Sequence, residues 1–76
     1  MVKTKSKLKD REIVEFVNAL AWDVYAKMGY HAPDGYRFYE SFHPQEKLCW
    51  RVAAHIYEKI TYTDVENALN TLWKDN

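Results

Sequence analysis

The apolar positions between residues 43 and 60 fall on two neighbouring stripes of one predicted helix. Positions in the first stripe recur at intervals of three and four residues, which is the spacing of one helix face. This stripe contains Leu48, Cys49, Val52, Ala53, Ile56 and Ile60. The second stripe contains Trp50, Ala54 and Tyr57. A helix that is apolar over so much of its surface has to be covered on more than one side, so we predict that the chain is built around this segment.

The start of this central helix is marked by a proline. Pro44 at the first helical position costs no hydrogen bond and sets φ in advance, so His43 or Ser41 is expected to cap the helix. The helix is expected to end near Lys59. Because the first stripe is assigned to the core, truncating Ile56 to Ala is predicted to cost ~2–5 kcal/mol of stability.

A second amphipathic pattern spans residues 10–28. Its apolar positions follow a 3.6-residue repeat at Ile13, Val17, Leu20, Val24 and Met28, widened by Val14, Phe16, Ala21, Trp22 and Tyr25. Asp10 is a suitable N-cap. Gly29 is a helix stop, because glycine adopts the left-handed conformation at little steric cost. Tyr30 is then expected to pack back on the last turn, near Tyr25.

A third, shorter helix is predicted near the end of the chain. Its face repeats at i, i+3, i+4 and i+7 and consists of Val65, Ala68, Leu69 and Leu72, with Trp73 beside it. Thr63 with Glu66 matches a capping box, and Thr61 with Asp64 is a shifted alternative. The start of this helix therefore has two candidate caps.

The long connection over residues 30–43 is rich in aromatic residues. Residues 32–35, Ala-Pro-Asp-Gly, are typical of a β-turn with glycine in the fourth position. Four of the seven residues from 36 to 42 are aromatic. We expect Phe38 and Phe42 to cover the core, and Tyr36 and Tyr39 to be half-exposed and available for binding. The predicted fold is all-α: a small three-helix bundle with an aromatic-rich connecting segment between helices 1 and 2.

Charge divides the chain into two unequal parts although the net charge is zero. Residues 1–11 carry five basic residues and one acid, and residues 12–76 carry six basic residues and ten acids. We predict a basic flexible tail over residues 1–9 and a single domain over residues 10–76. An acidic domain argues against a duplex-DNA binder, which normally has a basic body. The tail offers four candidate phosphate contacts, Lys3, Lys5, Lys7 and Lys9.

The sequence carries no recognisable catalytic, metal or cofactor signature. Its histidines are twelve residues apart and its single cysteine, Cys49, lies on the apolar stripe, so no zinc-binding spacing is present. Two isolated glycines exclude a phosphate-binding loop. Arg51, His55 and Glu58 are helical neighbours and are expected to form a solvent-facing charged strip. We therefore expect no catalytic residues, no metal and no cofactor.

The absence of long apolar runs and the single cysteine favour a cytoplasmic protein without a membrane span. No signal peptide is visible in the lysine-rich start. In size and aromatic content the chain resembles the small helical proteins encoded by phages and prophages, many of which bind and inhibit host or defence proteins. That resemblance implies an inhibitor or adaptor and transfers no site residues.

The main functional hypothesis rests on a surplus of aromatic surface. Three Trp, six Tyr and three Phe are more than three short helices readily bury, and aromatic side chains are enriched in interfaces. We expect a non-catalytic protein-interaction module that self-associates or occupies a surface on another protein. Its candidate contacts are Trp22, Tyr36, Arg37, Tyr39, Trp50 and Tyr57. The alternative is a nucleic-acid or nucleotide binder that uses the lysine arm and the linker tyrosines.

Overall fold

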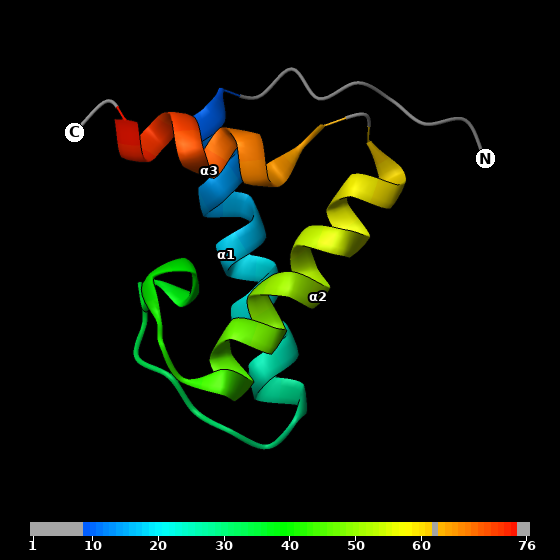
Figure 1. Cartoon of the computed structure of the whole chain (residues 1–76). Coiled ribbons are helices and arrows are strands. Elements are labelled where there is room, and N and C mark those ends of the chain that lie inside the picture. The colour runs from blue at the N-terminus through cyan, green and yellow to red at the C-terminus, as the bar shows by residue number, and fades with distance from the viewer. Residues whose placement is uncertain (1–8, 62, 75–76) are drawn as a thin grey trace.

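The computed structural model describes residues 9–61 and 63–74, and within these residues the fold is all-α (Figure 1). Its elements are α1 (Asp10–Lys27), the short 3-10 helix η1 (Phe38–Glu40), α2 (Pro44–Ile60) and α3 (Val65–Lys74). The predicted three-helix bundle with an aromatic-rich connection is confirmed. Residues 1–8 of the predicted tail lie outside the described residues, so the division into tail and domain stays a prediction.

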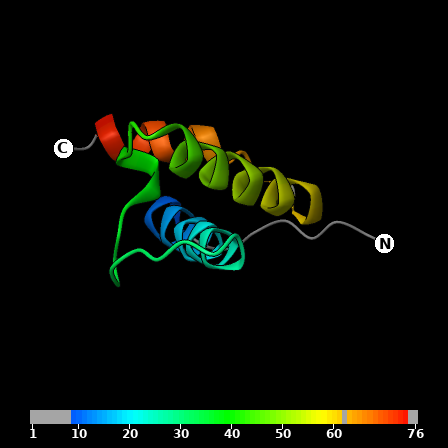
Figure 2. The same cartoon turned by 90° about the horizontal axis from the view of Figure 1, so that it is seen from below.

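α1 and α2 form an antiparallel pair, and the remaining elements pack on it. In Figure 1, α1 runs down the molecule, α2 runs back up, and α3 crosses near the start of α1. Seen from below, the connecting segment closes one side of the pair (Figure 2). Both α3 and η1 contact α1 as well as α2. α1 and α2 are therefore the two helices on which the other elements pack.

The core draws on every element. Residues with at most 2% exposure are Val14, Val17, Ala21, Phe38, Cys49, Ala53, Val65 and Ala68. Small side chains on both central helices, Ala21 and Ala53, allow their axes to approach closely. Phe38 was correctly predicted to cover the core. Cys49 is also buried, as expected.

The end of α1 follows the predicted glycine mechanism. Gly29 has a φ of 92°. The Gly29 N–H donates to the Ala26 carbonyl at 3.0 Å, and the Tyr30 N–H donates to the Tyr25 carbonyl at 3.2 Å, which is the Schellman arrangement. The rings of Tyr25 and Tyr30 stack with centroids 5.0 Å apart. The predicted contact between these two tyrosines is confirmed.

The helix starts differ from the predictions in detail. Lys9, and not Asp10, is the N-cap of α1, and its backbone N–H donates to the Glu12 carboxylate at 3.2 Å. α3 uses neither predicted capping box. Its first turn is capped by Asp64, whose carboxylate accepts the Asn67 N–H at 3.1 Å. A carboxylate at this position satisfies a free backbone donor and favours the positive end of the helix.

At the start of α2, His43 and Ser41 both contribute to the cap. His43 occupies the N-cap position but makes no side-chain cap bond. The Ser41 hydroxyl accepts the His43 N–H at 3.0 Å and donates to the Glu46 carboxylate in the first turn. This arrangement fixes the backbone on both sides of Phe42. The Phe42 ring nevertheless is 93% exposed, so the prediction that Phe42 covers the core is wrong.

The β-turn in the connection is shifted by one residue from its predicted position. The Tyr36 N–H donates to the Pro33 carbonyl at 3.1 Å, which makes Gly35 the third residue of the turn. Gly35 has a φ of 79°. A positive φ at the third position is the reason this turn selects glycine there.

Candidate interaction surface

The α1–α2 pair has one covered face and one bare face. The covered face includes Asn18 and Trp22 on α1 and Trp50 on α2. The Asn18 amide N donates to the Tyr36 carbonyl at 2.6 Å, and its carbonyl oxygen accepts the Phe38 N–H at 2.7 Å. These bonds, together with α3, bury this side of the pair. The sequence offered no signal for the role of Asn18, because its partners lie about twenty residues away.

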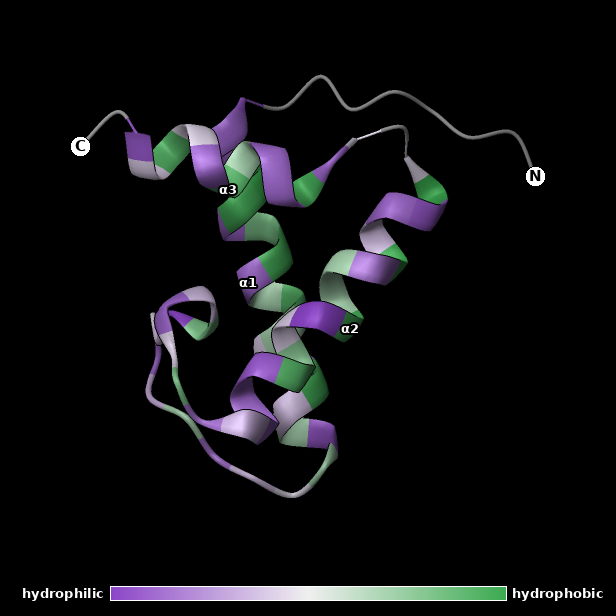
Figure 3. Cartoon of the chain, viewed as in Figure 1, coloured by the Kyte–Doolittle hydropathy of each residue, from purple (hydrophilic) through white to green (hydrophobic). Residues whose placement is uncertain are grey.

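The bare face carries two rows of apolar side chains. The α1 row is Phe16, Leu20, Val24 and Met28, and the α2 row is Leu48, Val52, Ile56 and Ile60. Neither row contains a charged residue, and each repeats every four residues. Figure 3 shows hydrophobic positions recurring on successive turns of both helices. We call these eight residues the bare face.

The two rows lie side by side along the helix pair. At one end, the rings of Phe16 and Tyr57 have centroids 5.5 Å apart. At the other end, the Met28 and Cys49 sulfur atoms are 3.7 Å apart. Between the ends, a shallow hollow of about 320 Å³ is lined by residues of both rows, with the buried Ala53 at its base and the charged Asp23 and Lys27 at its edge. The two rows therefore meet at this hollow, which Leu20, Val24 and Met28 of α1 line together with Ile56 of α2.

The exposed area of the bare face is comparable to that of the largest apolar patch on a typical monomer. Its six most exposed members are between 38% and 51% exposed, whereas Leu20 and Val24 are half-buried. With about 200 Å² for a fully exposed large side chain, these six leave roughly 500 Å² in water. The largest apolar patch on a typical monomer is ~300–600 Å² and is often functional. The predicted cost of 2–5 kcal/mol for Ile56→Ala assumed a buried residue, but Ile56 is 47% exposed.

The six contacts predicted from the sequence lie outside the bare face, and most of their side chains are used within the chain. The Trp22 indole N–H donates to the Ala32 carbonyl at 3.1 Å. The Tyr39 and Trp50 rings lie 5.4 Å apart. Tyr57 is 4% exposed and has almost no surface left for a partner, because α1 covers its ring. A direct contact role for the other five stays a prediction.

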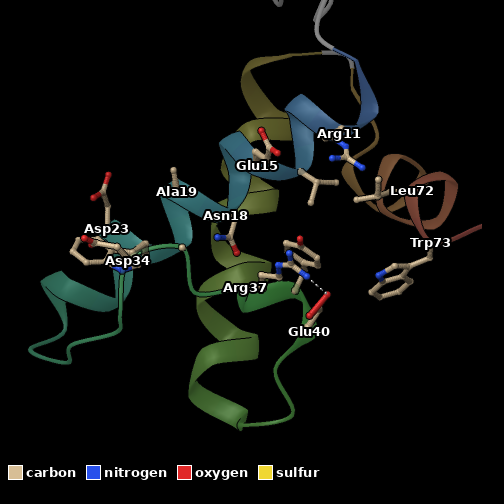
Figure 4. Close-up of a pocket in the computed structure, with 14 residues that line it drawn as sticks. Arg11, Glu15, Asn18, Ala19, Asp23, Asp34, Arg37, Glu40, Leu72 and Trp73 are labelled. Carbon is tan, nitrogen blue, oxygen red and sulfur yellow. Dashed lines mark hydrogen bonds and ion pairs between the residues drawn. The ribbon is translucent and has the colours of Figure 1, made fainter. Parts of the chain in front are cut away.

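A mixed-charge groove of about 680 Å³ crosses the covered side, between α1, the connection and the end of α3 (Figure 4). Trp73, 47% exposed, lies at one end, and Asp23 and Asp34 lie at the other. Between them, Arg37 forms an exposed ion pair with Glu40 at 3.4 Å. Such exposed pairs contribute little stability. The groove is wide and polar, and no buried charge converges on it.

A polar cluster around Glu46 joins α1, the connection and α2. The Glu46 carboxylate accepts hydrogen bonds from the hydroxyls of Ser41, Tyr36 and Tyr25, the last at 3.3 Å. The bonds from Ser41 and Tyr36 lower the pKa of Glu46, against the desolvation that raises it. Burial raises the pKa of Tyr25, and the bond to Glu46 raises the pKa of Tyr36. A carboxylate held ionised by protonated tyrosines serves as a structural anchor for the connection.

Of the groups considered for catalysis or metal binding, Cys49 is buried, and Glu58 is half-buried and hydrogen-bonded within the chain. Burial raises the pKa of the Cys49 thiol, which disfavours the reactive thiolate form. The Glu58 carboxylate accepts the Val65 N–H at 3.0 Å and so caps α3. Within residues 9–61 and 63–74, no group of three His, Cys, Asp or Glu side chains could hold a metal ion. No described helix is both long and apolar enough to span a bilayer.

Of the four lysines proposed to contact phosphates, the structure describes Lys9. Its side chain is exposed beside the start of α1. Lys3, Lys5 and Lys7 lie outside the described residues.

Comparison with known proteins finds no matching family model, no matching curated protein and no matching solved structure.

Proposed function

We propose that this chain is a non-catalytic protein-interaction module and that the bare face is its binding surface. The observation that carries the proposal is the set of exposed apolar side chains on α1 and α2, which meet around one hollow. The partner surface that suits it is the apolar face of another helical chain, because i±4 ridges pack into the grooves of a facing helix. The predicted inhibitor or adaptor role, in which the chain occupies a surface on another protein, is part of this proposal.

The size of the bare face decides what kind of contact it supports. Burying roughly 500 Å² of apolar surface is worth on the order of 12 kcal/mol at ~25 cal/mol per Å². Association itself costs ~4–15 kcal/mol in lost freedom of motion. The two magnitudes are comparable, so a partner has to cover most of the bare face to bind stably. A partner that contacted only one of the two rows would not bind stably.

The alternative of nucleic-acid binding gains no support from the described residues. It requires the rings of Tyr36 and Tyr39 to stack on bases. The Tyr36 ring packs edge-on against Phe38 with centroids 5.0 Å apart, and its hydroxyl is bonded to Glu46. Tyr39 packs on Trp50. The alternative stays a prediction of the sequence.

Photo-crosslinking tests the proposal without a known partner. A benzoylphenylalanine is placed at Val52 or Phe16, and control chains carry it at Glu66 or Asn70, which are exposed on α3. In the cells that make this chain, the two bare-face positions are expected to form adducts with a protein, and the control positions are not. Introducing Ile56→Lys into the Val52 chain should abolish its adduct, because a charge inside an apolar contact is costly. Equal adduct formation at all four positions, or none at any of them, would contradict the proposal.

A further inference from the structure

We infer that the occupant of the bare face is a second copy of this chain, packed across a two-fold axis. The inference rests on the proposed function, since it names the partner of the same surface. Three properties of the bare face support it: the equal spacing of its rows, its charge and its area.

The geometry of the bare face is suited to its own copy. Each row contains four apolar residues, one at every fourth position of its helix. The ridges of one helix pair can therefore pack into the grooves of an identical pair. In a two-fold dimer the same patch lies on both sides of the interface. Two α1–α2 pairs stacked in this way form a four-helix core, with α3 and the connecting segment on the outside of each copy. In this arrangement, each copy covers the bare face of the other.

Charge does not oppose the pairing of two copies. The net charge of the chain is zero at pH 7, so long-range repulsion between copies is small. The edge of the α1 row carries Asp23 and Lys27, which have opposite signs and line the same hollow. They supply a polar rim around an uncharged centre, which is the usual anatomy of an interface. A foreign partner selected by charge would require a net charge on the bare face, and the rows have none.

The area of the bare face matches a modest dimer. Two copies together remove roughly 1,000 Å² of apolar surface from water, and flanking residues add to this figure. Specific interfaces begin near ~1,000–1,200 Å². A dimer of this size is expected to dissociate reversibly, with a dissociation constant on the order of micromolar.

Sedimentation equilibrium on the purified full-length chain tests the inference directly. Between ~1 μM and ~1 mM, the wild-type chain is expected to change from monomer to dimer. Ile56→Lys and, independently, Val52→Lys are expected to raise the dissociation constant by about 100-fold or more, because each substitution enters a two-fold interface twice. In the single chain Val52 is 38% exposed and Ile56 is 47% exposed, so the helical circular dichroism of each variant should match the wild type. Asn70→Lys adds the same charge on α3, away from the bare face, and should leave the dissociation constant unchanged.

Two outcomes would overturn the inference. The first is a wild-type chain that stays monomeric up to ~1 mM. The second is a dimer whose dissociation constant is unchanged in both lysine variants, because such a dimer uses another surface. Raising the salt from ~0.1 to ~1 M should leave the dimer intact, whereas a steep loss of association with salt would indicate charge-driven pairing.

The outcomes also separate this inference from the proposed function. A monomeric purified chain whose bare-face positions still crosslink to a foreign protein contradicts only the second-copy inference. Crosslinking that does not depend on position contradicts the proposed function itself. Position-dependent adducts that have twice the mass of the chain support both.

Discussion

The covered and bare faces of the α1–α2 pair differ in chemistry as well as in exposure. The covered face carries aromatic rings with polar atoms, such as Trp22 and Trp50, and amide groups such as that of Asn18. The bare face carries mainly aliphatic side chains with no hydrogen-bonding capacity. A face whose side chains can form hydrogen bonds is suited to an irregular segment, because the backbone groups of that segment need partners. A purely apolar face suits another helix, whose backbone groups are already paired. The connecting segment packs on the covered face, where its backbone forms hydrogen bonds with Asn18 and Trp22.

The largest difference in stability is expected between substitutions at Phe38 and at Phe42. Phe38 is fully buried and Phe42 is 93% exposed, although they are four residues apart. Phe38→Ala is expected to lower the free energy of unfolding by ~3–5 kcal/mol through a cavity in the core. Phe42→Ala should change it by no more than ~0.5 kcal/mol. Urea denaturation at a concentration where the chain is monomeric measures both, and equal losses would refute the assignment.

The same contrast can be drawn between two leucines. Leu69 on α3 is 6% exposed, whereas Leu48 on the bare face is 51% exposed. Leu69→Ala is expected to cost ~2–4 kcal/mol in dilute solution and Leu48→Ala less than ~1 kcal/mol. At high concentration the cost of Leu48→Ala should grow, since dimer formation buries this position. A concentration-independent cost would argue against coverage of the bare face.

Asn18 tests how the connecting segment is held on the covered face, because its side chain forms two hydrogen bonds with the backbone of that segment. Asn18→Ala removes two hydrogen bonds and leaves the Phe38 N–H and the Tyr36 carbonyl part-buried without their partner. The expected loss is about 2 kcal/mol of unfolding free energy. Hydrogen exchange of the Phe38 amide should accelerate more than that of amides in α2. Ala19→Ser, on an exposed neighbour, is the matched control and should have little effect.

The smallest effect is expected from acid titration of Glu46. Its pKa is lowered in the folded chain from the ordinary value of 4.5. Stability from this carboxylate is therefore present above pH ~4.5 and is lost as the pH falls through the folded pKa. Glu46→Gln should flatten this part of the melting-temperature profile, and Tyr36→Phe should flatten it partly. If the melting temperature of Glu46→Gln depends on acidic pH as it does in the wild type, the Glu46 cluster does not contribute to stability.

Local signals in the sequence were sufficient to predict the three helices, the start of α2 and the end of α1. Pro44 and Gly29 act through their own backbone preferences, so the start of α2 and the end of α1 could be predicted without knowing what lies nearby. The buried members of each stripe, such as Val17, Cys49 and Ala53, follow from helical periodicity. The exact caps of α1 and α3 were missed, because several nearby residues offer the same chemistry.

Local residue preferences and helical periodicity were enough to predict the all-α fold, the extents of the helices and a surplus of aromatic surface. The uncovered rows are mainly aliphatic, and their location follows only from how the helices pack. Periodicity shows that a stripe is apolar, but coverage depends on where α3 and the connecting segment pack. The connecting segment occupies the side with Asn18 and Trp22, because both side chains form hydrogen bonds with its backbone. The aliphatic rows are left on the opposite side, and no local sequence pattern distinguishes them from a core.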